Sequence, residues 1–361
     1  MTQAIIWKDD VAFPLNAAYL SRQLDVRAGA ANSYAVVNGA GTGVAVLANT
    51  IIPLKSGATW KVYQFTTDSE ITTLDTGALT LGVNYYAYLC DDGSDAGLLL
   101  LSANATAPSG YNATNSRKII GFHYGRKRNS LTVADVTSGC VVPNSVWDLC
   151  HRPRCSPEGM VDLGNGVWVD AYLVSIDEAI TFAAGNGSPL TAGTGKSAFN
   201  ALPLTGTEGL SGYNFIELAR RSGKRLLSHS EWLAAAHGSP QGADANNTNA
   251  WAATGNSARK NCGYVVPAIS LLNVVDCAGN VFEWLDEFVT GPDGAGGWQD
   301  VMAGLGVGQI WMYGATNLSQ MCAGGYWPYG VNAGSRCVHS GDHYPWGVYT
   351  SVGCRLACDS L

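Results

Sequence analysis

The chain has little charge and no long hydrophobic run. Charged residues make up 14% of its 361 positions, hydrophobic residues make up 47%, and the formal net charge is −7. A weakly acidic chain has no basic surface for phosphate groups, so we expect no nucleic-acid partner. Its best uncharged apolar run, residues 265–275, is too short to cross a bilayer, so we expect no membrane insertion. The hydrophobic content nevertheless predicts a folded chain.

The amino terminus also lacks a secretory signal. Lys8, Asp9 and Asp10 occupy positions where a signal peptide needs an apolar stretch. We therefore expect no signal peptide and synthesis in the cytoplasm.

Motifs for metals and cofactors are missing as well. The ten cysteines include no C-x-x-C pair, and the E-P-N, Q-P-D and W-N-D motifs of calcium-dependent sugar sites do not occur. His339 and His343 are four residues apart, but glycine and proline interrupt their segment, so they need not share one helix face. We interpret both histidines as contact residues and expect no metal and no cofactor.

Most of the ten cysteines are interpreted as small buried residues. Cys337 could pair with Cys354 or Cys358 if the mature protein meets an oxidising environment. The sequence leaves both states open.

The first part of the chain is rich in short runs of strand-forming residues. They cover residues 34–38, 43–47, 60–65, 85–89, 98–101 and 118–124. Clusters of Gly, Asn, Asp and Ser separate these runs at spacings typical of a β-sandwich. We place the end of this β-rich domain at residue 143.

The second part of the chain adds helices. Residues 214–221 are apolar at helical spacing and end at a Ser-Gly capping signal. Residues 228–237 begin with a Ser-x-x-Glu capping box. Residues 187–212 and 239–261 are interpreted as long surface loops.

Residues 324–355 have the composition of a binding surface. Aromatic residues alternate there with Asn, Ser, His and Asp, which combine contact area at low entropic cost with adaptable hydrogen bonding. Glycines and tryptophans between them fit a supporting backbone. The segment therefore indicates a surface that binds rather than a pocket that catalyses.

Three motifs in the second part carry a family resemblance. They read G-K-R-L-L-S-H-S-E-W at 223–232, D-C-A-G-N-V-F-E-W at 276–284, and G-G-x-W, R and G-x-R between 324 and 355. These motifs resemble the formylglycine-generating-enzyme branch of the C-type lectin fold. The resemblance implies an α+β, C-type lectin-like domain at 144–361. With the β-rich runs before it, we expect a mainly β chain with a β-sandwich at 1–143 followed by this lectin-like domain.

The same motifs indicate which residues form the scaffold of that domain. They are Gly324, Gly325, Trp327, Arg336, Gly353, Arg355, Asn280, Glu283 and Trp284. Trp346, which lies outside the motifs, is added to the scaffold as a bulky anchor of the same segment. Glu283 is expected to pair with an arginine, either Arg336 or Arg355.

The formylglycine-generating enzymes carry a reactive cysteine pair between the Gly-Gly and Arg-Cys elements. The corresponding interval here, residues 326–335, contains no cysteine, and Cys337 matches a cysteine outside the reactive pair. We therefore expect no enzymatic activity. A formylglycine-generating-type oxidase is the least favoured alternative.

Shorter matching pieces extend over most of the chain. They lie in the same order at residues 89–93, 107–111, 117–124, 145–148, 152–153, 159–160, 167–172 and 213–215. By these pieces the chain resembles the major tropism determinants of bacteriophages, which are variable proteins of diversity-generating retroelements. The resemblance implies a homotrimer at the tail-fibre tip of a virion, made in the host cytoplasm and attached and trimerised through its β-rich domain. It implies a bacterial surface receptor, protein or glycan, and other tail-fibre proteins as partners. Compared with that family, we expect the extreme N-terminal domain to be shortened or absent.

This second resemblance also implies that adenines in AAC or AAT codons are randomised within residues 326–352. Such codons cannot yield Lys, Glu, Gln, Met or Trp, and the segment contains none of the first four. Trp327 and Trp346 are therefore expected to be constant. The expected variable, receptor-binding positions are Tyr326, Pro328, Tyr329, Val331, Asn332, His339, Asp342, His343, Gly347, Tyr349 and Ser351.

Together these observations predict a receptor-binding adhesin with a retroelement-diversified surface. The alternative is a cell-encoded variable surface or interaction protein on the same fold. A nearby reverse transcriptase gene would fit both, and neighbouring tail genes would favour the phage protein.

Overall fold

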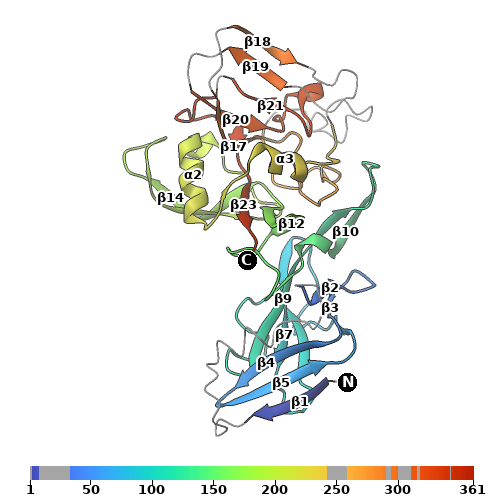
Figure 1. The fold of residues 1–361 in the computed structure, drawn as a ribbon. Coiled ribbons are helices and arrows are strands. Elements are labelled where there is room, and N and C mark those ends of the chain that lie inside the picture. The colour runs from blue at the N-terminus through green and yellow to red at the C-terminus, as the bar shows by residue number, and fades with distance from the viewer. Residues whose placement is uncertain are drawn as a thin grey trace. The chain divides into compact units, whose positions relative to one another are not determined.

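A computed structural model describes residues 2–7, 33–241, 258–289, 294–299, 310–314, 318–341 and 343–361, with the backbone alone at 2–7, 294–299 and 310–314. The described chain is mainly β, as expected, and its few helices are short. It divides into two compact units (Figure 1). The first comprises residues 1–126, 138–152 and Leu361, and the second comprises residues 127–137 and 153–360. The expected boundary at 143/144 stays a prediction.

The first unit is built from antiparallel strands in three sheets. The first sheet has the strand order β1 (Thr2–Trp7), β5 (Thr59–Phe65), β4 (Thr50–Ser56). The second sheet has the order β2 (Ala35–Val37), β3 (Val44–Val46), β6 (Ser69–Ile71). The third sheet has the order β10 (Val136–Val141), β9 (Ser116–Arg128), β7 (Val83–Cys90), β8 (Leu98–Ser102), and β11 (Trp147–Asp148) pairs with β9. All six strands expected from the sequence are confirmed. Tyr63, Phe65 and Phe122 lie in one buried core that all three sheets share.

Strand β4 was not among the predicted strands, and Pro53 lies in its middle. Proline cannot donate a ladder hydrogen bond and is therefore confined to edge strands or bulges. In the described part of its sheet, β4 pairs only with β5, so Pro53 lies on an edge strand opposite Val62. The edge position therefore accommodates the proline.

His123 in β9 is buried, and its Nδ1 lies 2.8 Å from Oδ1 of Asn84. Burial lowers the pKa of His123 from 6.5 to about 4. The unfolded state therefore binds more protons between these two values, and stability present above pH 6.5 is lost as the pH falls through this window. The full contribution is about 3 kcal/mol.

We expect His123→Gln to flatten this pH dependence, because glutamine does not titrate. Denaturant unfolding at pH 7 and pH 5 measures the change for wild type and variant. The exposed His237→Gln is the control and should keep the wild-type difference. An identical loss of stability on acidification in wild type and His123→Gln would contradict the assignment.

The second unit contains three further sheets. The first of them has the strand order β12 (Met160–Gly164), β13 (Val167–Asp170), β23 (Leu356–Asp359), β16 (Arg225–Leu226). The second pairs β14 (Val174–Phe182) with β15 (Leu190–Ser197). The third has the order β18 (Gly294–Gln299), β19 (Ile310–Gly314), β21 (Val338–His339), β20 (Ser319–Ala323), β17 (Phe282–Val289), β22 (Val352–Gly353). The position of β15 corrects the prediction of a continuous loop at 187–212. Small and polar residues in β15 resemble loop composition, but its pairing with β14 satisfies the backbone. The loop expected at 239–261 lies largely outside the described residues.

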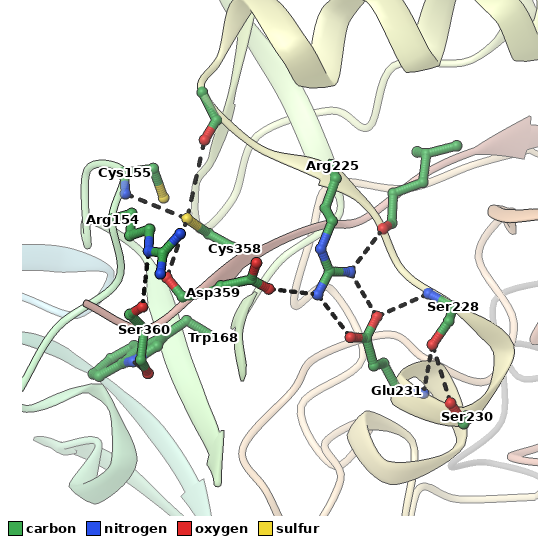
Figure 2. A network of polar contacts seen from close by, with 12 residues as sticks. Arg154, Cys155, Trp168, Arg225, Ser228, Ser230, Glu231, Cys358, Asp359 and Ser360 are labelled. Atoms are coloured by element: carbon green, nitrogen blue, oxygen red, sulfur yellow. Dashed lines mark hydrogen bonds and ion pairs between the residues drawn. The ribbon is translucent and has the colours of Figure 1, made fainter. Parts of the chain in front are cut away.

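Both expected helices of the second unit are confirmed. Helix α2 (Gly212–Arg221) buries Phe215 and Leu218 in the same core as Phe282, while helix α3 (His229–Ala235) begins with the predicted capping box. Figure 2 shows how Arg225 extends this cap: its guanidinium donates to both oxygens of Glu231 at 2.7 Å and to Asp359 at 2.9 Å. Charge-assisted, bidentate bonds of this type fix geometry strongly. They connect α3 to the last strand of the chain.

Cys337, Cys354 and Cys358 are free, buried thiols, so the pairing considered from the sequence is not formed in this structure. Among the described helices, none combines the length and the apolar character that a membrane crossing requires.

Candidate functional site

The predicted binding segment packs on two aromatic residues of β17. Phe282 and Trp284 are 0% and 1% exposed. Strand β17 lies between β20 and β22 in the sheet order, so both its neighbours belong to the C-terminal part of the chain. We call Phe282 and Trp284 the platform.

The structure brings five of the predicted contact residues together around this platform. Ring centroids lie 5.6 Å from Phe282 for Tyr326, 4.9 Å for Tyr329, 5.7 Å for His339 and 5.8 Å for His343, and 5.9 Å from Trp284 for Tyr349. The rings also touch each other, at 4.5 Å between the two tyrosines nearest Phe282 and at 4.7 Å between His343 and Tyr349. Edge-to-face and tilted pairs of this kind add stabilisation beyond buried area. We call these five residues the aromatic cluster.

Exposed side chains accompany the cluster in sequence. Pro328 and Val331 are exposed, and Val331 lies in a 3₁₀ turn (Gly330–Asn332) that directly follows Tyr329. Trp346 is 54% exposed and stacks on Tyr344 with the two rings 5.3 Å apart. Exposed apolar groups beside half-buried aromatic rings are typical of a contact surface.

Backbone hydrogen bonds hold the segment at several points. Gly206 N–H donates to the carbonyl of Tyr349 at 2.9 Å, Gln320 N–H to that of His343 at 2.9 Å, and Tyr213 N–H to that of Pro345 at 3.0 Å. Gly324 adopts a left-handed backbone (φ 92°), where an added Cβ would collide with the Cys277 carbonyl oxygen. The segment is therefore fixed by bonds that do not depend on its own side chains.

A buried ion pair lies within the same unit. Arg355 and Glu283 are each about 1% exposed, and Arg355 Nε donates to Glu283 Oε2 at 3.0 Å. The guanidinium also donates to the carbonyls of Asp170 at 2.9 Å and Val275 at 2.6 Å. Burial opposes the charged form of Arg355, but the adjacent Glu283 carboxylate outweighs it and raises the pKa of Arg355. Of the two arginines considered from the sequence, Arg355 is the partner of Glu283.

The predicted scaffold residues occupy two kinds of environment. Seven are buried: Gly324, Gly325, Gly353, Arg355, Asn280, Glu283 and Trp284. Asn280 has φ 62°, accepts from the Lys260 N–H at 2.9 Å and donates to the Lys260 carbonyl at 3.1 Å, so it fixes that segment of the chain. Trp327 is only half-buried, while Arg336 and Trp346 are exposed, so packing gives no reason for the last two to be constant. Their constancy stays a prediction.

The predicted variable residues also differ in exposure. Tyr326, Tyr329, Asn332, His343, Gly347, Tyr349 and Ser351 are half-buried, and Asp342 lies outside the described residues. His339 is 4% exposed, so it differs from the accessible contact residue we expected. Burial and the neighbouring His343 lower the pKa of His339 to about 3.

His339 and His343 lie side by side, although glycine and proline interrupt the segment between and around them. Their Nδ1 atoms are 3.0 Å apart, and Cys322 Sγ belongs to the same group, in which all ligand atoms lie within 4.8 Å of one another. Cys322 was not a predicted site residue. No local motif identifies it, because it meets His339 only through the pairing of β20 with β21.

The chain is mainly β and carries an aromatic cluster packed on the platform. These features are typical of a binding protein. Residues 35–148 match the family model "Mtd second domain". The chain is 28% identical over 318 residues to the tail fiber receptor-binding protein of Bordetella phage BPP-1, covering 83% of this chain and 76% of that protein. The solved M1 variant of the major tropism determinant is similar at a TM-score of 0.67 and 26% identity, over 91% of this chain and 84% of that one. For the P3c variant the values are 0.66 and 25%, with the same coverage.

Over most of its length the chain is therefore similar to the major tropism determinants, and residues 35–148 match the second domain of that family.

Proposed function

We propose that the chain is a receptor-binding tropism determinant of a phage tail fibre, and that the half-buried residues of its aromatic cluster, with the adjoining exposed residues, contact a bacterial surface receptor. Similarity to the major tropism determinants supports the class of function, because one relative is a tail fiber receptor-binding protein. The observation that carries the site is the gathering of Tyr326, Tyr329, His343 and Tyr349 over Phe282 and Trp284. Aromatic residues on a fixed support are the usual anchors of protein interfaces.

Preorganisation is the physical basis of this proposal. Ordering a mobile side chain on binding costs about 0.5–1.5 kcal/mol. The rings of the cluster already pack on each other, and hydrogen bonds from Gly206, Gln320 and Tyr213 hold the backbone beneath them. Most of that cost is therefore met during folding. Such a preorganised surface is suited to binding rather than to catalysis.

We also infer that the segment 326–352 is diversified by a retroelement at the eleven positions named from the sequence. The backbone contacts of the segment support this idea, because they persist when side chains change. Val331 and Pro328 are exposed and tolerate replacement most easily.

At the level of domains we infer a β-sandwich followed by a C-type lectin-type domain, assembled as a homotrimer at the fibre tip on the virion. The mainly β fold and the similarity to a tail fiber receptor-binding protein support this arrangement. Light scattering of the purified chain should give three times the chain mass. A monomer at micromolar concentration would contradict the trimer.

Receptor binding can be tested with labelled, purified chain and a panel of bacterial strains. We expect saturable binding to at least one strain. Val331→Asp places a charge in the proposed contact surface and should weaken binding about tenfold or more, which corresponds to about 1.4 kcal/mol. Leu131→Asp is the matched control, since Leu131 is 71% exposed and Val331 is 61% exposed.

The control variant should bind like wild type, because Leu131 lies in the 127–137 segment, away in sequence from the proposed surface. Saturable binding to no strain, or equal losses in both variants, would contradict the proposal.

A further inference from the structure

Cys322, His339 and His343 are brought together by the fold rather than by local sequence. Cys322 in β20 and His339 in β21 are direct cross-strand partners. Residues paired in this way present their side chains on the same face of the sheet, about 5 Å apart at Cβ. His343 joins them because Gln320 of β20 donates its N–H to the His343 carbonyl at 2.9 Å. Backbone bonds therefore fix the approach of all three side chains.

The separations of the three ligand atoms fit a tetrahedral metal ion. Zinc binds cysteine sulfur and histidine nitrogen at about 2.0–2.3 Å, which places ligand atoms roughly 3.3–3.6 Å from each other. The Sγ and ring nitrogen atoms here all lie within 4.8 Å of one another, and the two Nδ1 atoms are 3.0 Å apart. Binding would bring any longer separation in this group to about 3.5 Å by rotation of the side chains.

We propose that Cys322, His339 and His343 form a zinc site with one thiolate and two imidazole ligands. This ligand set suits zinc better than calcium or magnesium, which prefer oxygen. On binding, the thiol of Cys322 loses its proton to solvent, and neutral histidines donate ring nitrogen lone pairs. Three protein ligands leave a fourth position for water or for a donor group of a bound partner.

The surroundings favour retention of the ion. Cys322 and His339 are 0% and 4% exposed, and the ring of Phe282 lies 5.7 Å from His339 and 5.8 Å from His343. Trp284 lies 5.9 Å from His343. An apolar shell of this kind limits access of water to a metal site. The zinc would link β20, β21 and the segment after β21, and would so restrict the motion of the cluster residues that these elements carry.

One consequence rests on the proposed function. Both histidines are predicted variable positions, whereas Cys322 precedes the segment 326–352. Metal binding would then be a property of this particular copy, lost in any variant that replaces either histidine.

The test uses the full chain, freed of metal with a chelator and titrated with Zn²⁺ by calorimetry. We expect one zinc ion per chain. Co²⁺ in place of zinc should give the visible absorption of a tetrahedral site and a thiolate-to-cobalt charge-transfer band. Cys322→Ser should remove that band and weaken zinc binding about a hundredfold or more.

Two controls separate ligation from folding. Cys337→Ser changes another fully buried thiol of the same core and should keep the charge-transfer band. His343→Ala changes the one half-buried ligand of the three and should lower zinc affinity, while His237→Ala should not. Absence of zinc binding in wild type, or a cobalt band that survives Cys322→Ser, would overturn the proposal. Because these readouts need no receptor, a chain that binds zinc but no bacterial strain would contradict only the proposed function.

Discussion

Replacing Arg355 with Met is expected to lower the free energy of unfolding by about 3–5 kcal/mol. The substitution leaves the Glu283 carboxylate buried without its cation and removes the donors to the carbonyls of Asp170 and Val275. Removing one partner of a buried ion pair costs more stability than the intact pair contributes, because the remaining charge is then buried without water or a counter-ion. Denaturant unfolding monitored by tryptophan fluorescence measures the change.

Arg336→Met is the matched control, since Arg336 is an exposed arginine of the same C-terminal segment. Its change should stay within about 0.5 kcal/mol. The double substitution Arg355→Met with Glu283→Leu should recover part of the loss, because no charge is then left buried. Equal stability of Arg355→Met and Arg336→Met would show that the Arg355–Glu283 pair does not stabilise the second unit.

The second large effect is expected for Phe282→Ala. Phe282 is 0% exposed and touches the rings of Tyr326, Tyr329, His339 and His343. Its loss opens a cavity beneath the aromatic cluster and should cost about 3–5 kcal/mol of stability. The same substitution should weaken binding to bacterial cells, because the rings lose their common support.

Phe288→Ala provides the comparison within the same strand. Phe288 is 39% exposed and stacks on Tyr213, so its replacement should cost about 1 kcal/mol or less. Unfolding curves of the two variants give the difference. If Phe282→Ala proved as stable as Phe288→Ala, the platform would not support the cluster as described.

Local signals in the sequence were sufficient for much of the fold. Alternating β-type runs between glycine-rich turns predicted the strands around Phe65 and Phe122, and a capping box predicted the start of α3. Strands and caps depend on neighbours close in sequence, which is why they could be predicted. The composition of the C-terminal segment indicated a binding surface, and the family resemblance implied which of its residues make contact.

The remaining features depend on distant partners. Pro53 in β4 is acceptable only because its strand is at an edge, and Cys322 becomes a site residue only through pairing with β21. Trp346 was expected to support the fold, yet it lies exposed against Tyr344. Burial and cross-strand contacts are properties of the tertiary structure, and no local pattern encodes them.

We infer that a constant fold presents side chains that change, and sequencing this gene from many progeny of one parent measures this. We expect replacements confined to the named positions within 326–352, with Trp327, Trp346, Arg355 and the platform unchanged. Replacements spread evenly along the chain would contradict it.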